Sequence, residues 1–285
     1  MTTLVRKPAD FRQACDDARA SPRRVGLVPT MGALHDGHLS LIDEAKARAD
    51  FVAATIFVNP LQFAPGEDLD RYPRTLETDL AGCRDRGVDL VFAPEPGSMY
   101  PPEFQTQVFV GELAKPLEGE FRRSHFDGVT TVVAKLFNLV GPCVAMFGRK
   151  DYQQWKILSR MAEDLDMPIE VVGCPIVREA DGLALSSRNR HLSASERARA
   201  LGIVSGLRRA YDAWELGERG LDTLRSLAEE AVRSDFDRVD YVAVVDPDTL
   251  AAPAGFASRL LIAVAAHLGA TRLIDNVVLG EDLRP

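Results

Sequence analysis

Two histidines at a predicted helix start are the side chains of this chain best suited to chemistry. His35 and His38 lie three residues apart in the segment HDGH, so in a first helical turn both imidazoles project to one side. A helix N-terminus adds unpaired N–H groups and the positive end of a dipole. Gly32 and Gly37 let the backbone approach a ligand closely. The segment therefore predicts a phosphate site.

Two other interpretations of the histidine pair are open. The imidazoles could be polar surface side chains without a ligand, or they could bind a metal. One common type of zinc-binding helix places two histidines four residues apart, with a glutamate between them. Here Asp36 and Gly37 lie between the histidines, and no third ligand is evident. The position of the pair between a strand and a helix favours the phosphate site.

The elements that must position this pair alternate between apolar runs and helical patterns. Strands are expected over 24–29, 51–58, 88–94, 143–148 and 169–177, and helices over 38–50, 76–86, 128–141 and 151–165. This repeated order predicts an α/β fold with a Rossmann-like, doubly wound parallel sheet. Ligands bind such sheets beyond the carboxyl ends of the strands, where the HDGH segment is expected to lie.

The pattern changes near Val177. Asp181 and Gly182 form a turn signal between extended segments, which predicts a hairpin. The segment SASE, 193–196, predicts a capping box. Helices are expected over 194–214 and 221–234, then antiparallel strands over 239–246, 259–269 and 271–279. We therefore predict a Rossmann-like domain over 1–176 and a smaller C-terminal α+β domain over 177–285.

Composition excludes several classes of function. The net charge of -8 gives no support for a basic nucleic-acid-binding face. No apolar run approaches the roughly 20 residues that a membrane span needs, and the first residues lack the apolar core of a secretory signal. The four cysteines form no C-x-x-C pair, which suits reduced thiols in the cytoplasm.

Six blocks of sequence carry a resemblance to a known family. HDGH matches the H-x-G-H signature of the nucleotidyltransferase superfamily, which is related in fold to class I aminoacyl-tRNA synthetases. The longer segment PTMGALHDGHLSLI, 29–42, resembles the pantothenate synthetase family. The other blocks are FVNPLQF (57–63), YPRT (72–75), HFDGVTTVV (125–133), FGRKDYQQ (147–154) and READGLALSSRN (178–189).

The resemblance implies a ligase that uses ATP as co-substrate. ATP and (R)-pantoate form pantoyl adenylate and pyrophosphate, and β-alanine then attacks the acyl carbon to give pantothenate and AMP. Mg²⁺ is implied mainly on the ATP phosphates, with a contribution from Asp79. The family is typically a homodimer. The C-terminal domain is expected to act as a lid that closes on ATP.

The ATP-binding residues follow from the matching blocks. The resemblance implies that ATP is bound by Met31, Gly32, Ala33, Leu34, His35, Asp36, Gly37, His38, Gly148, Arg149, Lys150, Asp151, Val177, Leu185, Ser186, Ser187 and Arg188. His38, as proton donor, His35 and Lys150 would be catalytic. The family commonly has glutamate at Arg149 and often methionine at Leu185, and the first difference puts any acidic role at that position in doubt.

The pantoate-binding residues are implied to be Gln62 and Gln154, with Gln62 also near β-alanine. A neutral amide binds a carboxylate without withdrawing as much of its electron density as a guanidinium would. Asn59, Val132 and Val133 are further candidates, and Phe63 and Met31 could complete an apolar wall. Asn59 and Tyr72 could instead order the loop, and the two valines could simply pack a helix on the sheet. Arg122 and His125 also match, without an assigned role.

Two other functions compete with the ligase. Another H-x-G-H enzyme could transfer a nucleotide to a phosphorylated alcohol, which would leave Gln62 and Gln154 unexplained. A nucleotide sensor without catalysis could use the same scaffold, although both histidines and Lys150 are intact.

Overall fold

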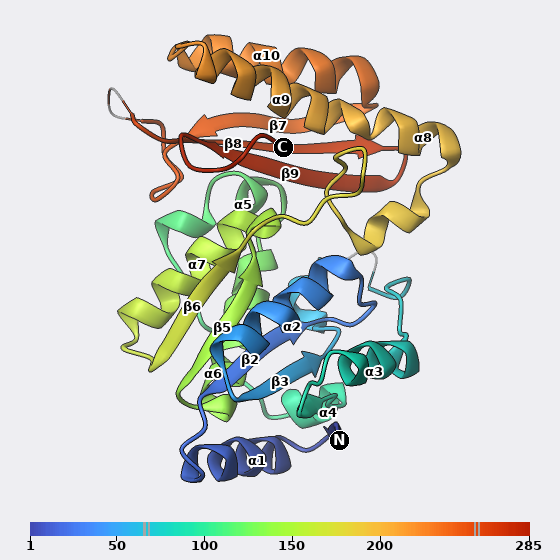
Figure 1. The fold of residues 1–285 in the computed structure, drawn as a ribbon, viewed down its shortest axis with the longest axis vertical. Coiled ribbons are helices and arrows are strands. Elements are labelled where there is room, and N and C mark those ends of the chain that lie inside the picture. Colours follow the sequence, from blue (N-terminus) through green and yellow to red (C-terminus); the bar gives the residue numbers. More distant parts are fainter. Residues whose placement is uncertain (65–66, 68, 254, 256) are drawn as a thin grey trace. The chain divides into compact units, whose positions relative to one another are not determined.

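The computed structural model of the chain describes residues 1–64, 67, 69–253, 255 and 257–285 (Figure 1). The chain forms two compact units. The first comprises Met1–Arg149 and Gln154–Pro175, and the second comprises Lys150–Gln153 and Ile176–Pro285. Each unit has its own apolar core.

A parallel sheet forms the centre of the first unit. Its strands are β1 (Thr3–Val5), β2 (Val25–Thr30), β3 (Phe51–Ile56), β4 (Leu90–Phe92), β5 (Cys143–Gly148) and β6 (Ile169–Cys174). Their order is β1-β4-β3-β2-β5-β6, and every neighbouring pair is parallel. The chain moves outward from β2 in one direction and then returns to place β5 on its other side. The topological switch point, where such sheets bind ligands, is therefore between β2 and β5.

Helices cover both faces of this sheet. They are α1 (Pro8–Ala20), α2 (Asp36–Arg48), α3 (Leu76–Asp85), α4 (Pro96–Met99), α5 (Glu118–Phe121), α6 (His125–Val140) and α7 (Tyr152–Asp164), with short 3₁₀ turns η1 (Pro60–Gln62), η2 (Glu112–Ala114) and η3 (Arg149–Asp151). Apolar residues of α2 and α3 pack in one core cluster. Those of α1, α6 and α7 pack in another. The layers are therefore helix, sheet and helix, which confirms the expected doubly wound fold.

The second unit is built on a three-stranded antiparallel sheet in the order β7-β8-β9. Its elements are η4 (Ser187–His191), α8 (Ala194–Arg199), α9 (Leu201–Glu215), α10 (Leu221–Asp235), β7 (Arg238–Val245), β8 (Leu260–Leu268) and β9 (Thr271–Leu279). The helices α9 and α10 pack on one face of this sheet (Figure 1). The predicted α+β character and the capping box of Ser193 and Glu196 are both confirmed.

Three features differ from the sequence-based expectations. The short strand β1 and the helix α1 were not predicted. A three-residue strand has no readable alternation, and β1 is defined by its pairing with β4, where Thr3 lies opposite Leu90. The single helix expected over 194–214 is divided into α8 and α9. Arg199 Nε donates to the carbonyl of Asp235 at 2.6 Å, which ties the end of α8 to the end of α10.

The four cysteines are free thiols, and burial raises the pKa of each of them. Within the described residues, no helix combines the length and the apolar character needed to cross a membrane.

Candidate active site

The two histidines that follow β2 cap the helix α2 with their own side chains. His35 is the N-cap residue, and its Nδ1 accepts a hydrogen bond from the backbone N–H of Gly37 at 3.2 Å. The backbone N–H of His35 in turn donates to Nδ1 of His38 at 3.4 Å. The ring centroids are 4.1 Å apart, so the two imidazoles lie together as the spacing predicted. This arrangement is a capping box made of two histidines.

This reciprocal cap determines where the imidazole protons lie. Both Nδ1 atoms accept a backbone N–H, so neither can carry a proton while it does so. The neutral rings of His35 and His38 must then carry their proton on Nε2. Two Nε2–H donors are thereby held side by side at the start of a 13-residue helix, whose N-terminal end already favours an anion.

Asp79 organises the loop that leads into this cap. The loop contains Gly32 with φ of 83° and Ala33 with φ of 52°, and the left-handed conformation is unfavourable for alanine. The buried carboxylate of Asp79, on α3, accepts the backbone N–H of Ala33 at 3.0 Å and of Leu34 at 2.8 Å. A Cβ at Gly32 would lie 2.9 Å from Oδ2 of Asp79, so the loop needs glycine there.

The role expected for Asp79 was a contribution to a magnesium site. Oδ2 also accepts the hydroxyl of Thr75 at 3.2 Å, so both carboxylate oxygens have partners within the protein. Among the residues described here, no group of three or more histidines, cysteines or acidic residues could hold a metal ion. Metal binding by Asp79 stays a prediction, whereas its hydrogen bonds assign it to the loop.

Gln62 is positioned from the next loop by Asn59. Asn59 Nδ2 donates to Oε1 of Gln62 at 3.1 Å and to the carbonyl of Gly128 at 3.0 Å. Asn59 Oδ1 accepts the hydroxyl of Tyr100 at 2.8 Å and the N–H of Leu61 at 3.3 Å. Asn59 is only 1% exposed, so these contacts favour the loop-ordering role, and direct substrate contact stays a prediction.

Two further contacts constrain the Gln62 side chain and its backbone. Gln62 Nε2 lies 3.1 Å from Sδ of Met31, which brings the two loops together. At Gly128 on α6, a Cβ would lie 2.2 Å from the carbonyl oxygen of Leu61. Glycine at this position therefore allows η1 to rest directly on the helix backbone.

His125 and Arg122 contact the same loop at the backbone carbonyl of Gln62. His125 Nδ1 lies 3.0 Å from the carbonyl of Gln62, which accepts a hydrogen bond from it. Burial, assisted by the charge of Arg122, lowers the pKa of His125 to about 4. Arg122 forms a two-pronged ion pair with Glu67, at 2.9 and 2.7 Å. Burial alone would raise the pKa of Glu67, but the hydrogen bonds and charge of Arg122 outweigh it and lower that pKa.

The other predicted pantoate-binding residues lie on helices of the first unit. Val132 and Val133, on α6, are 6% and 4% exposed and belong to the apolar core, which favours the packing interpretation. Gln154 is half-buried in the first turn of α7. Substrate contact by these three residues stays a prediction.

The segment after β5 begins at the other side of the switch point. A Cβ at Gly148 would meet no atom within 4 Å, so protein packing does not require glycine there. The guanidinium of Arg149 lies 5.6 Å from the centroid of the Trp155 ring, a cation–π contact that a glutamate could not make.

The remaining predicted ATP-binding residues belong to the second unit. Lys150 Nζ is 3.8 Å from the carboxylate of Asp151, and the lysine side chain is 18% exposed. The predicted hairpin is present, with a bridge between Arg178 and Ala184. Val177 closes it by accepting the N–H of Leu185 at 3.0 Å.

The segment after this hairpin contains the hydroxyls and the guanidinium expected to bind phosphate. Ser186 caps η4 by accepting the N–H of Arg188 at 3.3 Å. Ser186, Ser187 and Arg188 are all half-buried. They occupy the N-cap and the first two positions of η4.

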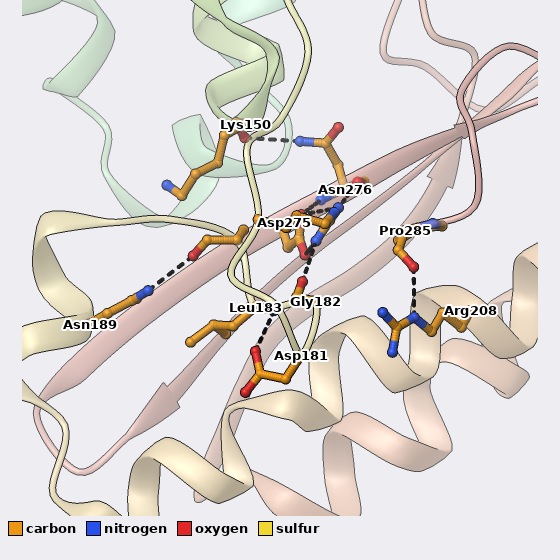
Figure 2. A network of polar contacts seen from close by, with 11 residues as sticks. Lys150, Asp181, Gly182, Leu183, Asn189, Arg208, Asp275, Asn276 and Pro285 are labelled. Carbon is orange, nitrogen blue, oxygen red and sulfur yellow. Dashed lines mark hydrogen bonds and ion pairs between the residues drawn. The ribbon is translucent and has the colours of Figure 1, made fainter. Parts of the chain in front are cut away.

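Asp275 and Asn276 on β9 were not predicted as site residues. Both are buried, and both are bonded to segments predicted to bind ATP (Figure 2). The one signal in the sequence was an adjacent pair of polar residues between apolar ones, in the order Leu-Ile-Asp-Asn-Val-Val-Leu.

Known proteins of a single family match this sequence over nearly its whole length. A profile of the family described as pantoate-beta-alanine ligase matches residues 3–278. Pantothenate synthetase 1 of Bradyrhizobium diazoefficiens is 50% identical over 277 residues, covering 97% of this chain and 98% of the relative.

Solved structures give the same result. The pantothenate synthetase of Thermus thermophilus has a TM-score of 0.92 at 46% identity, covering 97% of this chain and 99% of that chain. The pantoate-beta-alanine ligase of Francisella tularensis was solved with β,γ-ATP and β-alanine. It has a TM-score of 0.80 at 30% identity, and the match covers 100% of each chain. With these matches and the histidine cap at the switch point of its sheet, the chain belongs to the pantoate-beta-alanine ligase family.

Proposed function

We propose that this protein condenses (R)-pantoate with β-alanine, at the expense of ATP, to form pantothenate, AMP and pyrophosphate. The observation that carries the proposal is the reciprocal cap of His35 and His38, which uses both Nδ1 atoms and places both imidazoles at a helix N-terminus. Membership of the ligase family and the Francisella tularensis complex with β,γ-ATP and β-alanine support it.

In the first step, a carboxylate oxygen of pantoate attacks the α-phosphorus of ATP. The bond from that phosphorus to the bridging oxygen breaks, and the electron pair leaves with pyrophosphate. Negative charge therefore grows on the leaving group, where His35 and His38 donate hydrogen bonds from Nε2. Donors held in place before the reaction stabilise such a transition state without further reorganisation. Lys150 adds a positive charge, and Ser186, Ser187 and Arg188 add further donors.

Pantoate is oriented by Gln62 and Gln154. The Gln62 side chain is held by Asn59 at 3.1 Å, so its amide is already oriented before substrate binds. Neutral amides leave the carboxylate of pantoate more nucleophilic than a guanidinium would.

In the second step, the amine of β-alanine attacks the acyl carbon of pantoyl adenylate. An amide bond forms, the amine loses a proton, the acyl–phosphate bond breaks, and AMP leaves. Water would hydrolyse the same adenylate, so a water-poor site is required.

Three further properties are part of the proposal. Mg²⁺ would be held mainly by the phosphates of ATP, with few protein ligands, and would supply neutralisation of their charge. The protein is a homodimer, which sedimentation would test. It acts in the cytoplasm, where free thiols such as its four cysteines are stable.

Exchange of labelled pyrophosphate into ATP tests the proposed function. We expect exchange that requires pantoate and does not require β-alanine. Exchange that ignores pantoate would indicate a different nucleotidyl transfer, and no exchange at all would indicate a nucleotide sensor.

A further inference from the structure

Two adjacent polar residues of β9 are buried in the second unit. Asp275 is 5% exposed and Asn276 is 3% exposed. Burying a carboxylate or an amide is unfavourable unless its hydrogen bonds are made inside the protein. Asp275 accepts the backbone N–H of Asn276 within the strand. The other partners of the two side chains are Arg178 and Lys150, far away in the sequence, and each lies in a segment that contains residues predicted to bind ATP.

Asp275 anchors the hairpin that leads to the predicted phosphate-binding turn. Arg178 donates to both of its carboxylate oxygens, at 2.6 and 3.0 Å. The same guanidinium donates to the carbonyl of Gly182 at 3.0 Å, which ties together the two arms of the hairpin. The hairpin then passes through Leu185 directly into Ser186. A two-pronged pair of this kind fixes orientation as well as distance.

Asn276 anchors the second segment, at Lys150. Its Nδ2 donates to the backbone carbonyl of Lys150 at 2.9 Å (Figure 2). The bond holds the main chain and does not involve the lysine ammonium, which lies 3.8 Å from the carboxylate of Asp151. Consecutive residues of one strand therefore hold two segments that are separated by about thirty positions in the sequence.

We propose that Asp275 and Asn276 are positioning residues for ATP, which keep Lys150 and the turn at Ser186–Arg188 at a fixed spacing. This inference rests on the proposed function, in which both segments bind the nucleotide. Cations and hydroxyls stabilise a triphosphate only when they converge on it, and a displacement of about 1 Å can cost roughly a hundredfold in rate.

A purely structural role is the alternative. Buried ion pairs, however, contribute little net stability compared with apolar side chains of similar size. Apolar side chains could fill the same space on β9, but they could not orient a guanidinium or hold the carbonyl of Lys150. Stability alone therefore gives no reason for these residue types.

The experiment compares Asn276→Ala and Asp275→Asn with a matched control, Asp240→Asn. Asp240 on β7 is also an acid of this sheet with a side chain only 6% exposed, and its partners are Arg272 on β9, at 2.8 Å, and His267 on β8, at 3.0 Å. Affinity for a non-hydrolysable ATP analogue is measured by calorimetry, together with the KM for ATP, the KM for β-alanine and the Tm.

We expect both β9 variants to weaken binding of the ATP analogue by about tenfold or more, the loss of one or two directed hydrogen bonds. The KM for ATP should rise in parallel, and the KM for β-alanine should not change. The control should lower the Tm and leave nucleotide affinity as in the unchanged protein. Nucleotide affinity equal to that of the control in both β9 variants would overturn the inference.

Two further outcomes are distinguishable. If Asp275→Asn does not fold, Arg178→Lys keeps the positive charge but removes the two-pronged bond, and unchanged ATP affinity in that variant would equally overturn the inference. If the unchanged protein binds the ATP analogue but shows no pantoate-dependent exchange, the proposed function fails, while the calorimetric comparison still decides the role of β9.

Discussion

Replacing Asp79 with asparagine should disorder the loop in front of the histidine cap. The Asp79 carboxylate accepts the N–H groups of Ala33 and Leu34 with its two different oxygens. Asparagine keeps one oxygen and presents an NH₂ group to the other amide, so one bond becomes a contact between two donors. A hydrogen bond to a charged group contributes about 1.5–3 kcal/mol, and the left-handed conformation of Ala33 costs about 1–2 kcal/mol once it is no longer held.

These contributions give a cost of about 3 kcal/mol for restoring the loop when ATP binds, which corresponds to roughly a hundredfold in kcat/KM for ATP. The assay is pantoate-dependent pyrophosphate exchange at varied ATP. Glu77→Gln is the matched control, because Glu77 is an exposed acid in the first turn of the same helix. If Asp79→Asn retained the kcat/KM of the control, the loop would not depend on this carboxylate.

Three more predictions concern the Gln62 loop and pantoate. Because burial and Arg122 lower the pKa of His125 to about 4, an unfolded chain binds more protons than the folded one between that pH and about 6.5. The free energy of unfolding is therefore highest above about pH 6.5 and falls as the pH falls toward 4. The free energy of unfolding of His125→Asn, measured in urea, should depend less on pH in this window. An unchanged pH profile would contradict the lowered pKa of His125. Gly128→Ala should lower the free energy of unfolding by about 1–3 kcal/mol through overpacking against Leu61. In the control Gly97→Ala, the new Cβ would meet no atom within 4 Å, and the free energy of unfolding should not change. Equal urea midpoints for the two variants would refute the overpacking argument. Gln154→Arg should lower the KM for pantoate and slow adenylate formation, and steady-state kinetics with faster turnover would show the electronic argument to be wrong.

The fold was largely predictable because its signals are local. Apolar runs, helical spacing and the turn at Asp181 and Gly182 each lie within a few residues, and the helix-and-strand order followed from them. The strand β1 was not predicted, because it has only three residues and is defined by its pairing with a strand that includes Leu90. The division between α8 and α9 was not predicted, and the end of α8 is bonded through Arg199 to Asp235, 36 residues away, a contact that no local pattern indicates.

The site was predictable to the extent that its residues lie close together in sequence. The spacing of His35 and His38 indicated a shared side, but their reciprocal bonds depend on the N-cap torsions of His35, with φ of -137° and ψ of 174°. Asp79 lies more than forty residues from the loop that it holds, and Asp275 lies 97 residues from Arg178. Such contacts leave no periodic pattern, and only the folded chain reveals them.

The rate of pantoyl adenylate formation in a His38→Asn variant tests the role of the histidine cap most directly. The Asn oxygen lies close to the position of Nδ1 and can still accept the N–H of His35, but the Nε2–H donor is gone. In a rapid-quench experiment with labelled ATP, we expect adenylate formation to slow by about 10²–10³-fold, with α2 and the unfolding transition preserved. Adenylate formation at the unaltered rate would contradict the claim that imidazole N–H groups stabilise the departing pyrophosphate.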